Sequence, residues 1–270
     1  MQPSTASPDR IRFDQPKAGL QRLSARFGGH AYDLHRHETY AVGLTIWGAQ
    51  SFHYRGSLRT SRAGQVMIIH PDEAHDGHAG VDRGFAYRML YVDPGAVGAA
   101  LEDAPPPFVP EVVTEDPVLS ALLGEAFGDF PRPLEPLAQD AIVGRLAERL
   151  AARSDGRRLR PGPAARRAVA LARDFLDAEA HRTVASEELE RLSGLDRFAL
   201  ARHFRTVHGT SPHRYQVGRR LLEAQRLIAE GMKPAEAAAT TGFADQSHLT
   251  RHFASRFGVT PGRWATLARA

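Results

Sequence analysis

Two stretches near the end of the chain repeat one pattern of apolar and polar positions. From Leu200 and from Leu249 they run in register at an offset of 49 residues, each as Leu-x-Arg-His-Phe followed by a glycine, a proline and an aromatic residue. In each copy the leucine and the phenylalanine lie four positions apart, which places both on one buried helical face. Repetition at this spacing predicts one supersecondary unit used twice.

Each copy predicts a helix, a glycine-containing turn and a second helix. The second helices begin after Asp196 and Asp245, whose carboxylates can accept hydrogen bonds from the first free backbone N–H groups. The leading helices are predicted over 186–192 and 234–240, and an apolar stripe predicts a connecting helix over 212–228. Adjacent major-groove faces lie about 34 Å apart, so a rigid pair of such units could read two successive grooves as a monomer.

The outward face of the two second helices supplies the candidates for DNA contact. Arginine, glutamine, serine and threonine at the start and middle of a helix can reach base edges or phosphates in a major groove. A solvated helix face would have the same composition, and the duplication favours DNA reading. The candidate DNA-binding residues are Arg197, Phe198, Ala201, Arg202, Arg205, Gln246, Ser247, Thr250 and Arg251.

These motifs resemble the DNA-binding domain of the AraC-type transcriptional regulators over about residues 165–268. The most specific stretch is Gly242-Phe243-x-Asp245-x-Ser247-x-Leu249-x-Arg251-x-Phe253, followed by Phe257-Gly258-x-Thr260-Pro261. Ala201 departs from the family, many members of which carry a polar base reader there. The resemblance implies binding to double-stranded promoter DNA and an activator that contacts RNA polymerase.

The balance of charged residues differs between the C-terminal part of the chain, where the two motifs lie, and the rest. Residues 160–270 hold 18 Lys and Arg against 11 Asp and Glu, whereas residues 1–159 hold 17 against 20. The basic C-terminal part is therefore expected to bind a polyanionic partner. Charge alone would also allow a membrane surface or an acidic protein as that partner.

The N-terminal part has a different pattern, with short β-branched or aromatic runs separated by glycine-bearing turns. The runs are 42–47, 51–54, 65–69 and 85–92. This pattern predicts a small antiparallel barrel or sandwich. In the last run Phe85, Tyr87, Met89 and Tyr91 alternate onto one face. A closed barrel of this size has room for its own side chains or for one small ligand.

Histidines give this barrel its candidate chemistry. His35-x-His37, followed by Gly64-x5-His70-Pro71-x3-His75, resembles the two half-motifs of a cupin, a sensor domain that AraC-like regulators often carry. A metal-binding cupin normally adds a glutamate after the second histidine, where Ala41 and Val42 stand here, so we predict no metal and no cofactor. The candidate ligand-binding residues for a small-molecule effector are His35, His37, His75, Trp47, Tyr87 and Tyr91.

Besides ligand binding, two other interpretations of these histidines remain open. Three imidazoles could hold a metal tetrahedrally together with a water molecule. They could also merely occupy the mouth of the barrel, because an imidazole serves equally as a hydrogen-bonding group.

A domain boundary is predicted at 154–163, where Gly, Pro and charged residues replace periodicity. It separates a sensing domain over 1–153 from a DNA-binding domain over 164–270. Two helices are predicted before it, over 117–130 and 134–153. The second carries an apolar stripe that can pack on its own domain, while the family resemblance implies that it pairs two subunits in a homodimer.

Composition excludes several kinds of site and several classes of protein. The 270 residues suggest two domains, and the absence of cysteine excludes disulfides, thiolate catalysis and cysteine-ligated zinc. The polar start of the chain does not resemble a signal peptide, and no apolar stretch approaches a membrane span. We therefore expect a cytoplasmic protein without membrane contact.

The sequence thus predicts an α+β fold of two domains, a cupin-like β-barrel with a helical pair followed by an all-α double helix-turn-helix. The predicted function is a sequence-specific DNA-binding transcription regulator, an activator controlled by a small molecule in the barrel. The alternative is a metal-dependent cupin enzyme with an appended DNA-binding domain. Because the metal motif is incomplete and no other acid/base or nucleophile constellation is present, we expect no enzyme activity.

Overall fold

The computed structural model describes residues 9–14, 19–102, 104–154 and 161–269. Most of the predicted linker, residues 155–160, and the first eight residues lie outside the described part. The strands are β1 (Arg10–Phe13), β2 (Leu20–Phe27), β3 (His30–His35), β4 (Tyr40–Tyr54), β5 (Ser57–Arg62), β6 (Val66–Ile69), β7 (His75–Ala79), β8 (Phe85–Val92) and β9 (Val113–Thr114). The helices are α1 (Pro94–Ala100), α2 (Pro117–Ala126), α3 (Pro136–Ala152), α4 (Pro163–Ala178), α5 (Ser186–Ser193), α6 (Arg197–His208), α7 (Pro212–Ala229), α8 (Pro234–Thr240), α9 (Gln246–Phe257) and α10 (Pro261–Arg269).

Strand β4 joins the two antiparallel sheets of the N-terminal domain. One sheet has the order β1-β2-β8-β4-β6-β9, and in the other β4 pairs with β5 and β7 while β7 also pairs with β3. The predicted runs 42–47 and 51–54 are therefore one strand and not two. The register shift of this strand, a β-bulge, lies between Thr45 and Trp47, and the nearby Gly48 (φ 71°) is a paired residue of the strand and not a turn. A Cβ there would lie 2.0 Å from Gly84 O.

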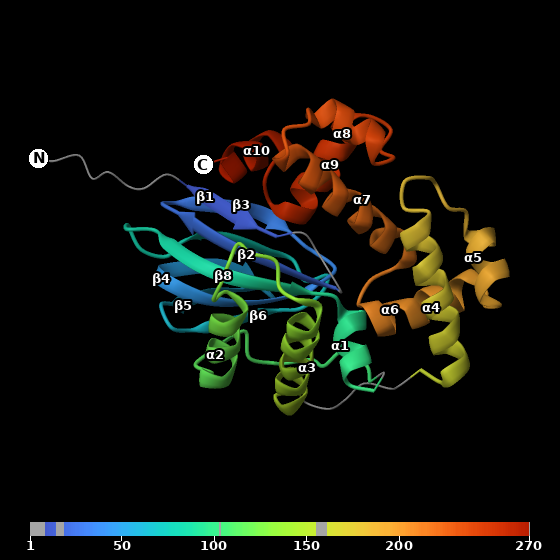
Figure 1. Ribbon diagram of the computed structural model, residues 1–270, viewed down its shortest axis with the longest axis horizontal. Coiled ribbons are helices and arrows are strands. Elements are labelled where there is room, and N and C mark those ends of the chain that lie inside the picture. Colours follow the sequence, from blue (N-terminus) through green and yellow to red (C-terminus); the bar gives the residue numbers. More distant parts are fainter. Residues whose placement is uncertain (1–8, 15–18, 103, 155–160, 270) are drawn as a thin grey trace, which may run out of the picture.

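Helices α1 to α3 cover one face of the larger sheet (Figure 1). Alternate residues of β4 and β8, such as Val42 and Leu90, share a fully buried cluster with Leu146 and Leu150 of α3. The apolar stripe of α3 therefore packs largely on its own domain. Its first member, Leu137, is different, because 84% of its surface is exposed.

The C-terminal domain contains the two expected helix-turn-helix units, α5–α6 and α8–α9, with α7 running between them (Figure 1). Asp196 accepts hydrogen bonds from the backbone N–H groups of Phe198 and Ala199, and Asp245 accepts one from that of His248. Both second helices end at a left-handed glycine, Gly209 or Gly258. These local signals explain why the helices begin and end where the sequence predicts.

The two domains pack directly against each other. The end of α9 lies on β3, where the Asp33 N–H donates to Gly258 O at 2.8 Å and the Arg36 N–H donates to Ser255 O at 3.0 Å. The Phe13 and Trp264 rings, from β1 and α10, lie 4.9 Å apart. No helix of the described residues combines the length and apolar character needed to span a membrane.

Candidate functional site

A pocket that is partly open to solvent lies between the barrel and the C-terminal helices. Its walls come from β2, the region from β3 to the start of β4, β8, α7, α9 and α10, so neither domain forms it alone. The lining residues are Gly19, Leu20, Gln21, Leu23, Tyr32, His35, His37, Thr39, Tyr91, Asp93, Arg219, Leu222, Gln225, Arg256, Phe257 and Trp264. We call this cavity the interdomain pocket.

The barrel side of the pocket presents His35, His37 and Tyr91. The ring centroids of His37 and Tyr91 lie 5.2 Å apart, nearly perpendicular to each other. Burial, and secondly the neighbouring His75, holds the pKa of both His35 and His37 well below the ordinary value. Both imidazoles are therefore neutral at pH 7.

His75 completes a cluster with these two histidines, although it does not line the pocket. Its ring centroid lies 4.2 Å from that of His35 and 4.9 Å from that of His37. In each of the three rings Nδ1 faces a backbone carbonyl oxygen, which can only accept, so Nδ1 carries the hydrogen. The three bonds run from His35 to Asp33 O (2.8 Å), from His37 to Thr39 O (2.9 Å) and from His75 to Glu73 O (3.0 Å).

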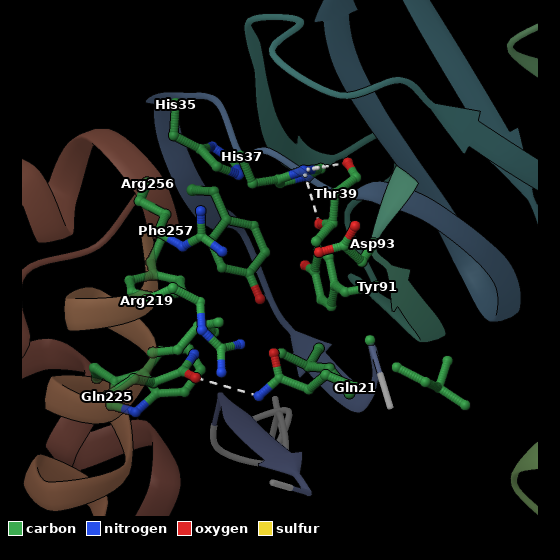
Figure 2. A pocket seen from close by; sticks show the side chains of 16 residues that line it. Gln21, His35, His37, Thr39, Tyr91, Asp93, Arg219, Gln225, Arg256 and Phe257 are labelled. Carbon is green, nitrogen blue, oxygen red and sulfur yellow. Dashed lines mark hydrogen bonds between the residues drawn. The ribbon is translucent and has the colours of Figure 1, made fainter. Parts of the chain in front are cut away.

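The C-terminal domain contributes the cations of the pocket. Figure 2 shows Arg219 and Arg256 on the side opposite Tyr91 and Asp93. Arg256 is buried and forms an ion pair with Glu38 of the barrel domain. Burial lowers its pKa to about 10, so it remains protonated at neutral pH. Nothing in the local sequence marked these arginines as pocket residues.

An amide pair also crosses the pocket between the domains. Gln21 Nε2 of β2 donates to Gln225 Oε1 of α7 at 3.2 Å, and both side chains are buried (Figure 2). Buried amides need such partners.

Three of the predicted ligand-binding residues, His75, Trp47 and Tyr87, lie outside the lining of the pocket. Trp47 is 39% exposed, and its ring lies 4.8 Å from the guanidinium of Arg26. Tyr87 is buried, and its hydroxyl donates to the Tyr32 hydroxyl at 2.7 Å, so it lies behind a residue that does line the pocket. The structure thus brings His35, His37 and Tyr91 together at one wall of the pocket, with His75 beside the two histidines.

The predicted DNA-reading residues lie on the first turns and middle of α6 and α9. Arg202, Arg205 and Arg251 are exposed, and Phe198 keeps 71% of its surface exposed. Arg197 is exposed too, but its guanidinium pairs with Glu190 at 2.9 Å and with Glu187 at 2.8 Å. The remaining predicted residues are the exposed Gln246 and Ser247 and the half-buried Ala201 and Thr250.

These reading residues lie apart from the contact between the domains. The barrel touches the end of α9 at Ser255, Arg256 and Gly258, whereas Gln246 and Arg251 precede that contact. The packed arrangement therefore leaves the reading residues of α9 exposed.

Known proteins provide independent comparisons. Residues 17–147 match the AraC-like ligand binding domain, and residues 189–266 match a helix-turn-helix domain. The chain is 26% identical over 231 residues to the uncharacterized HTH-type transcriptional regulator YbfI of Bacillus subtilis, across 83% of this chain and 84% of that protein.

Solved structures share the whole architecture. The crystal structure of ToxT from Vibrio cholerae superposes with a TM-score of 0.66 and 10% identity, across 93% of this chain and 99% of ToxT. A ToxT structure with bound unsaturated fatty acid gives a TM-score of 0.64 and 11% identity, across 99% and 97% of the two chains. At these identities the likeness concerns the fold.

The predicted fold class is therefore confirmed: an antiparallel β-sheet domain precedes a helical helix-turn-helix region. The matched domains cover both halves of the chain in the predicted order. The chain belongs to the AraC-type transcriptional regulators, with a ligand-binding domain followed by a DNA-binding domain.

Proposed function

We propose that this regulator binds its small-molecule effector in the interdomain pocket, and that occupancy changes how the DNA-binding domain is held against the barrel. One observation carries the proposal: the lining comes from both domains. A ligand seated there contacts both sides at once. It therefore has a different affinity for the packed and the separated arrangement, which is the condition for a ligand to shift such an equilibrium.

The lining favours an anionic ligand with an apolar body. Arg219 and Arg256 line the pocket while paired with Asp177 and Glu38, and the remaining donors of a guanidinium can still bind a carboxylate. Apolar side chains, among them Leu23, Leu222 and Trp264, supply the remaining surface. The unsaturated fatty acid bound by ToxT has this chemistry, so a long-chain carboxylate is the first class to test.

The test compares oleate with its methyl ester by isothermal titration calorimetry on the full chain. We expect oleate to bind at least about tenfold more tightly than the ester, because only the acid offers a carboxylate to the arginines. Arg219→Gln and Arg256→Gln should reduce that preference. Arg226→Gln is the matched control, because Arg226 lies on α7 and is ion-paired like Arg219 but does not line the pocket. Equal binding of acid and ester would contradict the proposal.

At the other end of the molecule we propose that α6 and α9 read promoter DNA through the predicted residues other than Arg197, which is held by Glu187 and Glu190. The protein would act as an activator that contacts RNA polymerase, and as a homodimer. In vitro transcription with purified RNA polymerase, from a promoter carrying a site enriched from random duplex DNA, tests the sign of regulation. A decrease in transcript would identify a repressor instead.

A further inference from the structure

We infer that His35, His37 and His75 form a binding site for a divalent transition-metal ion of the zinc type, bound through their Nε2 atoms. This inference goes beyond the proposed function and does not depend on it. A chain that binds zinc but no carboxylate effector would still satisfy it.

Strand register brings the three side chains together. His35 and His75 are directly paired across β3 and β7, and His37 follows two residues after His35. All three are buried, and one ring nitrogen from each lies within 4.8 Å of the others. Zinc–nitrogen bonds of about 2.1 Å in a tetrahedral site would place these nitrogens roughly 3.4 Å apart. Small rotations of the rings would therefore bring the three nitrogens to the separation that a bound zinc ion needs.

The hydrogen bonds of the three histidines orient their rings and set their tautomers in the way that binding a cation requires. Each Nδ1–H donates to a backbone carbonyl, as described above, which leaves the lone pair of each Nε2 available. Metal-ligating histidines have this arrangement, in which an outer partner fixes the tautomer and orientation of the ring.

One atom of the cluster lacks a partner. Nε2 of His37 is buried and makes no hydrogen bond with any described residue. Three neutral imidazoles that merely packed together would leave this acceptor unsatisfied, which is unfavourable in a protein interior. A metal ion among the three rings would satisfy it.

The donor set indicates the kind of metal. Within the described residues no carboxylate joins the three imidazoles in the cluster, and the nearby Glu38 is paired with Arg256. Three nitrogen ligands suit Zn²⁺ and leave a fourth position for water or another ligand. Since His35 and His37 line the interdomain pocket, that position is reachable from the pocket.

The experiment uses the untagged full-length protein, stripped with a chelator and titrated with Zn²⁺ in a calorimeter. We expect one Zn²⁺ per chain. His37→Gln and His75→Gln should each weaken Zn²⁺ binding by more than about 100-fold, beyond the loss typical of an outer-shell partner. His53→Gln is the control, because His53 is an exposed histidine of the same domain that pairs with Asp76, and it should bind Zn²⁺ as the unchanged protein does.

A second measurement needs no variant. X-ray absorption at the zinc edge of the loaded, unchanged protein should show three imidazole nitrogens in the coordination shell. The inference is overturned if the unchanged protein takes up no stoichiometric Zn²⁺, if fewer than two imidazoles surround the ion, or if both folded ligand variants bind it normally.

Discussion

Single arginines of the reading helices have different surroundings, which predict different roles. Arg202 and Arg251 are exposed on the middle of α6 and α9. We expect Arg202→Ala and Arg251→Ala each to cost about 1–3 kcal/mol of binding at a specific site, through lost base contacts. Arg205→Ala should instead weaken binding to all sequences and reduce the salt slope by about one unit, as for a lost phosphate contact. Fluorescence anisotropy at several salt concentrations measures both effects.

Arg197→Ala is the matched comparison for that series. Its guanidinium is engaged by Glu187 and Glu190 of α5, so its removal should affect the packing of α5 on α6 more than the choice of bases. Unchanged specific affinity in Arg202→Ala and Arg251→Ala would show that the reading face is wrongly placed.

Asp116 predicts a pH-dependent contribution to stability. Burial alone would raise the pKa of its carboxyl, but hydrogen bonds from Arg149 and from the Leu119 N–H lower it below the ordinary value. A depressed pKa means that the stabilisation is present above the unfolded pKa of about 3.9 and is lost as the pH falls through the folded value. Asp116→Ala should therefore destabilise the protein by about 2 kcal/mol at pH 7 and by less below pH 3.

Chemical denaturation of both proteins across this pH range measures the difference. Glu125→Ala is the control, because Glu125 is an exposed carboxylate on the same helix, α2, paired with Arg145. An Asp116→Ala effect that stays constant from pH 7 to pH 3 would contradict the role of the carboxylate charge.

Among the secondary-structure elements, those with local signals could be predicted from the sequence. Helices α6 and α9 begin after Asp196 and Asp245 and end at a left-handed glycine, so a few neighbouring residues determine each boundary. The sequence predicts a turn at Gly48, but this glycine lies within the continuous strand β4, where it pairs with Phe85. Whether a glycine ends a strand or lies within it depends on pairing partners far away in the sequence.

Helix α3 is the expected interface of the proposed homodimer. Its buried side is used within the domain, so pairing must use the outer side, where Leu137 is exposed beside the start of the helix. We expect Leu137→Glu to weaken the proposed dimer, because an exposed leucine favours contact and a carboxylate favours water. Sedimentation velocity measures the association. Leu171→Glu on α4 is the control, and an equal effect of both substitutions would argue against α3 as the interface.

At the scale of the whole molecule, the pocket could not be predicted because its walls are distant in sequence. Gln21 and Gln225, which hydrogen-bond across it, are 204 residues apart. A short sequence motif carries the histidines and so predicts them, whereas Arg219 and Arg256 reach the pocket only through the packing of the two domains.

The contact between the domains predicts a restraint on DNA binding. Glu38→Gln removes the charge that Arg256 meets in the buried ion pair, so the packed arrangement should be destabilised. If packing disfavours the DNA-competent arrangement, full-length Glu38→Gln should bind DNA roughly fivefold or more tightly, within the usual range of coupling between sites. Residues 161–270 alone should bind as tightly as the variant. Equal affinity of all three proteins would mean that the contact is not coupled to DNA binding.

Helix α7 fixes the geometry of the site that the protein can accept. Its 18 residues form one uninterrupted helix of about 27 Å between the two reading units. We therefore expect the two reading helices to keep a fixed separation and orientation, so that they cannot follow a change in the spacing or phase of the half-sites. One base pair inserted between the half-sites rotates them by about 35° and should abolish simultaneous contact. Ten inserted pairs, which restore the phase, should not rescue binding, whereas readers on a flexible tether would recover.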